Sequence, residues 1–293
     1  MKIKAVINPV SGNNETRNIT AQLVEELVDR KLLHSHDVFN TLPDGREIVD
    51  ENFLKDCDVV MVAGGDGTLH HVINSLKKYS ADKPVAYFPA GTMNDFATGL
   101  ELPVTIDEFC DMLANPSFKK IDLGKVGEKY FHYVLCGGAI VSISYETDQN
   151  LKNMIGKTAY YLSALTQLPQ ILAGTEIKVE SEEYNGEIDA ILFLVSNSPI
   201  VGGFQNIIPD AKFDDGKLHV CIIKKGTVID AIQQLYDIIN GSHTNRSDIV
   251  CFQTKKVTIT QKDGGFLDVD GELGESSPAD IEIAPGGLTI VVP

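Results

Sequence analysis

The first part of the chain alternates continuous apolar runs with helical patterns, and this alternation limits its fold more than any other feature. Strands that are apolar along their whole length are typical of a parallel sheet covered by helices on both faces. The pattern therefore predicts an α/β domain with a mainly parallel sheet. The expected strands span residues 2–7, 57–63 and 83–89, and the expected helices span 15–32, 68–79 and 105–115.

The pattern changes after about residue 121. Short segments of alternating apolar and polar residues then follow one another, joined by turns, which is typical of β-rich domains. Helical patterns interrupt them at 156–168 and 227–239. We therefore expect two domains, an α/β domain over 1–121 and a β-rich, sandwich-like domain over 122–293, with the last strand able to return to the first domain.

The charge balance excludes one class of partner. The chain has 293 residues, with 41 acidic and 25 basic side chains and a net charge of −16. Nucleic acid needs a basic footprint, and broad attraction to an anionic membrane needs one too. We expect no nucleic-acid partner.

The cysteines and the uncharged stretches bear on localisation. Five scattered cysteines form no C-x-x-C pair, which indicates a reducing compartment without a disulfide framework. The stretches 158–175 and 190–209 lack charge but contain proline, glutamine or glycine residues that do not suit a membrane span. We expect a cytoplasmic protein with no transmembrane segment.

Three turns rich in small residues follow the expected strands, at 8–12, 64–68 and 90–95. Ligands of open α/β sheets bind where strands end, and glycine lets a phosphate approach the backbone closely. The hydroxyl groups of Ser11, Thr68 and Thr92 add hydrogen-bond donors. Neither a P-loop nor a dinucleotide fingerprint is present, so these turns predict a phosphate site of another kind.

Asp66 stands in the middle of the second turn, where it would repel a phosphate. A divalent cation resolves this conflict: Asp66, Asp95 and Asp122 could hold Mg²⁺, partly through water. Each residue also has a plainer interpretation. Asp66 suits a helix cap, Asp95 suits an N-cap, and Asp122 suits a strand end.

Together these motifs resemble the catalytic domain family of diacylglycerol kinases, which includes sphingosine kinases. The similar stretches are NPVSG at 8–12, GGDGT at 64–68, FPAGTMNDFA at 88–97, IDLGKV at 121–126, IIPDAKFDDGKLHV at 207–220 and LDVDGE at 267–272. The resemblance implies ATP binding by the α/β domain, lipid binding by the β-rich domain and Mg²⁺ held by the three aspartates.

The resemblance also implies roles for single residues. Glu272 would be the general base that takes the proton of the lipid hydroxyl, although DGE is an ordinary hairpin turn as well. A second Mg²⁺ would bind the Asp215 carboxylate and the backbone carbonyls of Lys212 and Lys217, unless KFDDGK is a simple turn. The expected ATP contacts are Asn8, Ser11, Gly12, Thr41, Gly64, Gly65, Asp66, Gly67, Thr68, Leu69, His70 and Thr92.

The chain departs from the family pattern in two places. Asn13 and Asn14 stand where many members have a lysine, so Arg17 would have to supply that contact. His70 and His71 replace the usual Asn-Glu pair. His70 could still reach a nucleotide, although a histidine at a helix start is more often a surface residue.

We therefore expect an ATP- and Mg²⁺-dependent lipid kinase that converts diacylglycerol to phosphatidic acid in transient contact with a membrane surface. The apolar stretch 154–172 would line an acyl entrance or, more often for such a pattern, form a core helix. Two alternatives stay open: a kinase of the NAD kinase type, and a nucleotide-binding regulator without turnover. A homodimer is compatible with the sequence.

Overall fold

The computed structural model divides the chain into two compact units. It describes residues 1–11, 14–41, 48–139, 141, 172–205, 207–208, 210–262 and 264–293. Unit 1 comprises residues 1–123 and 285–293, and unit 2 comprises residues 124–284. The predicted helix at 156–168 and all but the last residue of the predicted acyl entrance at 154–172 lie outside the described residues.

Unit 1 is built on a parallel sheet, as the continuous apolar runs predict. Its strands pair in the order β15-β4-β3-β1-β2, and every pair is parallel. Every residue of β1 and β3 is buried. The strands are β1 (Ile3–Ile7), β2 (Val38–Asn40), β3 (Val59–Gly64), β4 (Val85–Pro89) and the C-terminal part of β15 (Ala279–Val292).

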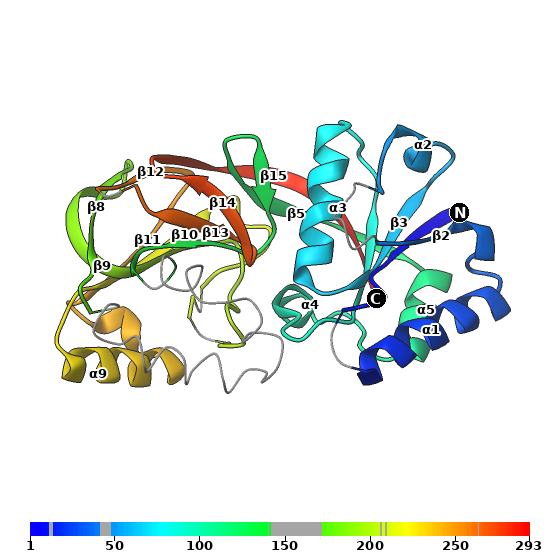
Figure 1. Cartoon of the computed structure of the whole chain (residues 1–293), viewed down its shortest axis with the longest axis horizontal. Helices are drawn as coiled ribbons and strands as arrows, with labels where there is room; N and C mark the ends of the chain where they lie inside the picture. Colours follow the sequence, from blue (N-terminus) through cyan, green and yellow to red (C-terminus); the bar gives the residue numbers. More distant parts are fainter. Residues whose placement is uncertain are drawn as a thin grey trace. The chain divides into compact units, whose positions relative to one another are not determined.

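Helices pack on this sheet because each presents an apolar face. Leu23 and Leu27 of α1 and Phe109 and Leu113 of α5 share one core cluster with alternate residues of the strands. Figure 1 shows α3 on the other side of the same strands. The helices of unit 1 are α1 (Asn14–Asp29), α2 (Glu51–Leu54), α3 (Asp66–Lys78), α4 (Asp95–Gly99), α5 (Ile106–Ala114) and the 3-10 turn η1 (Ser35–Asp37).

Unit 2 is antiparallel throughout its described strand pairs. Its strands follow the order β14-β13-β7-β9-β8-β12-β15, and β10 pairs with β9 and β11. Their inward residues, among them Phe131 and Phe193, form one core cluster. The strands are β6 (Lys129–Phe131), β7 (Val134–Gly137), β8 (Thr175–Glu180), β9 (Asn185–Ser196), β10 (Leu218–Lys224), β11 (Ile249–Thr254), β12 (Lys256–Gln261), β13 (Phe266–Val269) and β14 (Glu272–Ser276).

Two long strands contribute residues to both units. β5 (Ser117–Val126) begins in unit 1 and ends in unit 2, and β15 begins in unit 2 and ends in unit 1. Helix α9 (Val228–Ile239) and the 3-10 turn η2 (His243–Asn245) lie between β10 and β11 of unit 2. No helix of the described residues is long and apolar enough to cross a membrane.

The structure corrects several boundaries expected from the sequence. Residues 129–137 read as one strand but form β6 and β7, because residues 132–133 are a bend. Residues 279–293 read as two strands, but β15 continues through Pro285 and Gly286. The pattern also missed β2, β11, β14, α2 and α4, most of them short elements whose formation depends on their partners.

The β5–β6 pair yields a test of the packing in unit 2. Gly124 lies opposite Phe131, and a Cβ at Gly124 would overlap the Phe131 ring, which is fully buried. We expect Gly124→Ala to lower the free energy of unfolding by about 1–3 kcal/mol, because the ring has no room to move. Urea unfolding measures the loss, and the double change Gly124→Ala with Phe131→Leu should recover part of it. Unchanged stability of the single variant would contradict the packing described.

Candidate functional site

The three glycine-containing turns of unit 1 meet at one place. They leave the carboxyl ends of β1, β3 and β4, which are neighbours in the sheet. A Cβ at Gly65 would lie 3.2 Å from the Cα of Gly91 and 3.5 Å from the Ser11 Oγ. The backbones of the second and third turns are thus in contact, with the first turn beside them, as the sequence predicts.

Asn8 ties the first turn to the second. Its side-chain amide donates to the Thr68 Oγ1 at 3.0 Å, and its backbone N–H donates to the Ala63 carbonyl at 2.9 Å. Its Oδ1 accepts from the Val10 N–H at 3.1 Å, which closes the turn. The Thr41 N–H donates to the Ile7 carbonyl at 2.8 Å, so Thr41 also lies at the end of β1.

Asn94 shapes the third turn. It has a left-handed backbone, with φ 54° and ψ 42°, a conformation that asparagine tolerates better than most residues. Its Oδ1 accepts from the Gly91 N–H at 2.9 Å, and its Nδ2 donates to the Gly91 carbonyl at 3.0 Å. These two bonds fix the loop that the exposed Thr92 occupies.

Asp66 is not the N-cap of its own helix. It is the first residue of α3, and Gly65 before it is the N-cap, without a side-chain cap. The Asp66 Oδ2 instead accepts from the backbone N–H of Asp95 at 3.2 Å, at the start of α4. The side chain therefore reaches from the second turn to the third, and the residue is buried.

Tyr87 lies beneath this pair of aspartates and is not among the residues predicted from the sequence. Its hydroxyl donates to the Gly64 carbonyl at 3.2 Å and lies 3.5 Å from the Asp66 Oδ1. Burial first, and then the negative charges of Asp66 and Asp95, raise the pKa of Tyr87 well above its usual value. The signal that could have identified Tyr87 is a polar aromatic residue near the end of an otherwise apolar strand.

The three aspartates expected at the cation are all buried, but their hydrogen bonds differ. Asp66 and Asp95 are joined through the bond just described. The Asp122 Oδ1, from β5, accepts from the Gly286 N–H of β15 at 2.7 Å. Asp122 thus fixes two strands of unit 1 to each other, and its share in a cation site stays a prediction.

Of the remaining expected ATP contacts, Gly67 is half-buried and two residues of α3 are buried. Leu69 is fully buried, and its backbone N–H donates to the Gly65 carbonyl within α3. His70 is buried and lies against Asn74, whose Nδ2 donates to the His70 carbonyl at 3.0 Å. These contacts give both residues a packing role in α3. Gly12 lies outside the described residues.

In unit 2, Glu272 begins β14 directly after a two-residue turn. Asp270 and Gly271 form this turn, with φ of 55° and 86°. The buried Asp270 carboxylate accepts from the backbone N–H groups of His132, Tyr133 and Val134, at 2.9–3.1 Å. It also lies 2.7 Å from the His132 Nδ1. Asp270 thus anchors the hairpin that carries Glu272, and it is not among the site residues predicted from the sequence.

Asp215 is explained within its own turn. Its Oδ1 accepts from the Lys217 N–H at 3.0 Å, and its Oδ2 lies 2.8 Å from the His219 Nε2. The Lys217 ammonium group donates to Gln253 at 2.9 Å. These contacts account for the Asp-Asp-Gly sequence as a closed turn, so the second Mg²⁺ site of Lys212, Asp215 and Lys217 stays a prediction.

Comparison with known proteins identifies the family. Residues 2–126 match the model of the diacylglycerol kinase catalytic domain, and residues 138–292 match that of the YegS C-terminal NAD kinase beta sandwich-like domain. A diacylglycerol kinase of Bacillus subtilis is 30% identical over 295 residues, covering 100% of this chain and 96% of the relative. The chain belongs to the diacylglycerol kinase family. It is a kinase with the two-domain architecture that its motifs predict.

Other members of the diacylglycerol kinase family agree with this placement. A diacylglycerol kinase of Staphylococcus carnosus is 29% identical, covering 95% of this chain and 90% of the relative. The crystal structure of a putative diacylglycerol kinase from Bacillus anthracis superposes with a TM-score of 0.81 at 27% identity, covering 100% of this chain and 97% of that one.

The contact between the second and third turns can be tested directly. A Cβ at Gly91 would lie 2.5 Å from the Gly65 Cα and 2.8 Å from the Asn94 Oδ1. We expect Gly91→Ala to push the turns apart at a cost of about 1–3 kcal/mol, which weakens nucleotide binding roughly 5- to 150-fold. Calorimetric titration with ATP measures the affinity.

Thr98→Ala is the matched control for this variant. The Thr98 hydroxyl donates to the Asn94 carbonyl on the exposed side of α4, outside the contact between the turns. The control should bind ATP like the unmodified chain. Equal affinity for Gly91→Ala in a folded protein would show that the turns do not form the nucleotide site.

Proposed function

We propose that this kinase transfers the γ-phosphate of ATP to the hydroxyl group of a lipid, with diacylglycerol as the substrate and phosphatidic acid as the product. The observation that carries the proposal is the meeting of three glycine-containing turns above two buried aspartates, in a chain of the diacylglycerol kinase family. The α3 N-terminus and the hydroxyl groups of Ser11 and Thr68 suit a phosphate chain at this point.

The donor chemistry of the turns fits Mg²⁺. Asp66 and Asp95 offer carboxylate oxygens, the ligands that Mg²⁺ prefers, and both are buried. Burial first, and then the negative charge of these aspartates, raises the pKa of Tyr87. When bound, Mg²⁺ would offset this charge and that of the phosphates. Asp66 and Asp95 would hold it, and Asp122 would support them.

Glu272 is the proposed general base. Its carboxylate would take the proton of the lipid hydroxyl as that oxygen forms a bond to the γ-phosphorus, while the bond from the γ-phosphorus to the β–γ bridging oxygen breaks and ADP leaves. The Asp270 anchor supports this role, because a base must be held in place. The turns of unit 1 would hold the phosphates still during the transfer.

The assignment of Glu272 as the general base can be tested by a conservative substitution. Glu272→Gln keeps the shape of the side chain but cannot take a proton, so we expect turnover with diacylglycerol in mixed micelles to fall about 10²- to 10⁴-fold. ATP affinity should stay unchanged, because the turns of unit 1 are untouched. Full turnover of the variant would show that another group accepts the proton.

A soluble substrate is the second candidate, and one finding favours it. The family model that matches residues 138–292 carries the description of an NAD kinase beta sandwich-like domain. Phosphorylation of NAD with no transfer to any lipid would replace the lipid proposal. A panel of lipids and NAD, tested with the same ATP concentration, separates the two.

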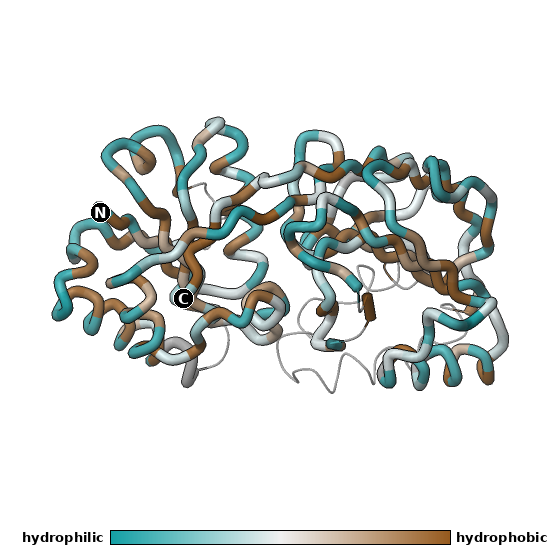
Figure 2. Tube along the Cα trace, turned by 180° about the vertical axis from the view of Figure 1, so that it is seen from behind, coloured by the Kyte–Doolittle hydropathy of each residue, from teal (hydrophilic) through white to brown (hydrophobic). Residues whose placement is uncertain are grey.

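Helix α9 supports contact with a lipid surface, which we propose to be the cytoplasmic face of a membrane. Val228, Ile229, Ile232 and Tyr236 are 46–68% exposed and share one face of the helix by their spacing. Figure 2 shows hydrophobic residues recurring along this helix. An uncharged apolar face of this kind suits shallow insertion between lipid headgroups.

The membrane proposal predicts a loss of vesicle binding. We expect Ile232→Asp to reduce co-sedimentation with vesicles that contain diacylglycerol by about tenfold or more, because a charge replaces an exposed alkyl group that would enter the lipid. Val104→Asp is the matched control, since Val104 is 69% exposed but lies in unit 1. Equal binding of both variants and the unmodified chain would exclude α9 as the contact.

A further inference from the structure

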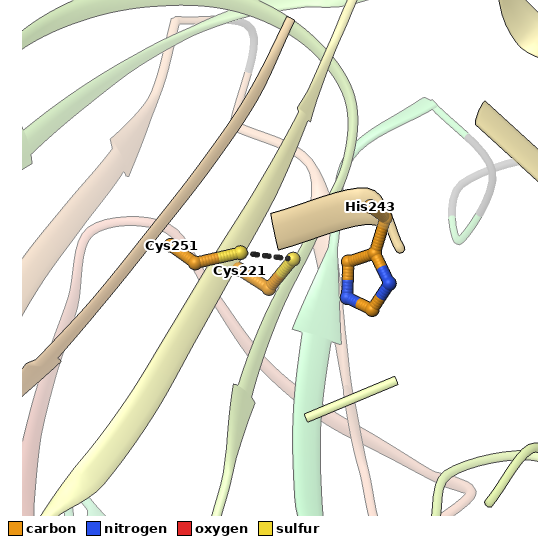
Figure 3. Close-up of side chains that lie close together, drawn as sticks. All are labelled: Cys221, His243 and Cys251. Atoms are coloured by element: carbon orange, nitrogen blue, oxygen red, sulfur yellow. Dashed lines mark hydrogen bonds between the residues drawn. The ribbon is translucent and has the colours of Figure 1, made fainter. Parts of the chain in front are cut away.

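Two of the five cysteines face each other in unit 2. Cys221 of β10 and Cys251 of β11 are direct partners in the antiparallel register, and their sulfur atoms lie 3.1 Å apart. Direct partners on antiparallel strands have Cα atoms about 4.5–5.5 Å apart, which lies within the range that a disulfide needs. Figure 3 shows the two side chains pointing toward each other. A bond between the two sulfur atoms therefore needs little movement of the backbone.

The two thiols differ in access to solvent. Cys251 is exposed, because β11 lies at an edge of the described sheet and pairs only with β10. Cys221 is buried in a cluster with Ile191, Ile223, Ile238 and Ile249. An oxidant from solvent would therefore react with Cys251 first, because Cys221 is buried beside it. An exposed attacking thiol beside a second thiol is the arrangement of reversible thiol oxidation.

The local electrostatics separate Cys251 from every other thiol of the chain. The hydrogen bond with Cys221 lowers the pKa of Cys251, because the Cys221 S–H can donate to the Cys251 thiolate. The same bond, together with burial, raises the pKa of Cys221. Burial also raises the pKa of Cys57, Cys110 and Cys136. The thiolate is the reactive form, so Cys251 is the thiol best prepared for oxidation.

We propose that Cys221 and Cys251 form a reversible modification site, a dithiol that closes to a disulfide when it meets a peroxide. The Cys251 thiolate attacks one peroxide oxygen, the O–O bond breaks, and a sulfenic acid forms at Cys251 with release of hydroxide. The Cys221 sulfur then attacks the Cys251 sulfur, the S–O bond breaks, and water leaves after taking the Cys221 proton. The protein loses two electrons and the peroxide gains them.

The proposed disulfide would restrain one segment of unit 2. The disulfide would close a loop over residues 222–250, which contains α9 and η2. Ile238 of α9 packs in the same cluster as Cys221. The disulfide would therefore join the two ends of this segment beside the cluster on which α9 packs. Since cross-linking reduces the conformations open to the unfolded chain, the oxidised protein should unfold at a higher temperature than the reduced one.

A bound metal ion is the alternative to a disulfide at Cys221 and Cys251. His243 lies beside the two cysteines, and one ligand atom from each of the three residues lies within 4.8 Å of the others. One observation favours the disulfide. The sulfur atoms, 3.1 Å apart, are closer than the ~3.8 Å that two thiolates keep around tetrahedral zinc.

The test uses the full chain, treated with hydrogen peroxide after removal of metals by a chelator. We expect the count of free thiols to fall from five by two, with one linked peptide pair containing Cys221 and Cys251 and full recovery by dithiothreitol. Cys136→Ser is the matched control and should still form the link. In Cys221→Ala the link cannot form, so a dione probe should trap sulfenic acid at Cys251.

Three results would overturn the proposal. The first is a free-thiol count that peroxide leaves unchanged, and the second is linkage of Cys251 only between two copies of the chain. The third is tight binding of one zinc ion that Cys221→Ala and His243→Ala both abolish, which would assign the place to a metal. Thermal unfolding of the oxidised and reduced protein then measures the effect on residues 222–250.

Discussion

The backbone of Gly65 touches the backbone of Gly91, and the arrangement of the turns in unit 1 depends on this contact. The strand order places the ends of β1, β3 and β4 side by side, but neighbouring turns meet only where no side chain separates them. The hydrogen bonds from Asn8 to Thr68 and from Asp95 to Asp66 then span distances that the glycines have already shortened. Glycine is required here by the close approach of two chain segments.

The charge around this contact gives the turns their chemistry. Asp66 and Asp95 are buried among elements of unit 1, beside a tyrosine whose pKa their charge helps to raise. Burial of two carboxylates in one place is costly unless positive charge or hydrogen-bond donors compensate them. A backbone N–H supplies part of this compensation to Asp66. A divalent cation carried by a nucleotide would add positive charge beside them, which is why the proposed ATP site and the proposed cation site belong together.

The sequence predicted the parts of the fold that depend on local pattern. The strands β1, β3 and β4 are apolar because they are buried on both faces, so their sequence alone indicates a parallel sheet. The sequence allowed the last strand to return to the first domain, but it did not indicate the pairing of β15 with β4, because Ile290 and Val85 are far apart in the chain. Contacts of this kind depend on the folded chain, and periodicity does not encode them.

The site residues also divide into those with a local sequence signal and those whose role depends on distant contacts or on backbone conformation. The glycine turns and Asp66 could be found because their residue types are rare in that pattern. Tyr87, Asn94 and Asp270 were missed, because each acts through a partner distant in the fold or through a special backbone conformation. Asp215 shows the reverse case, since a motif that suits a cation also closes an ordinary turn through Lys217 and His219.

The acidic side chains of the DVDGE segment, residues 268–272, differ in the contacts they make. Asp268 accepts from the Gly271 N–H at 2.7 Å, which closes the turn, and Asp270 accepts from three backbone N–H groups, which anchors it. Both carboxylates are committed to the shape of the hairpin. Glu272 follows them, half-buried at the start of β14. A base must be held in place for proton transfer, and in the proposed mechanism these two aspartates hold the hairpin that carries Glu272.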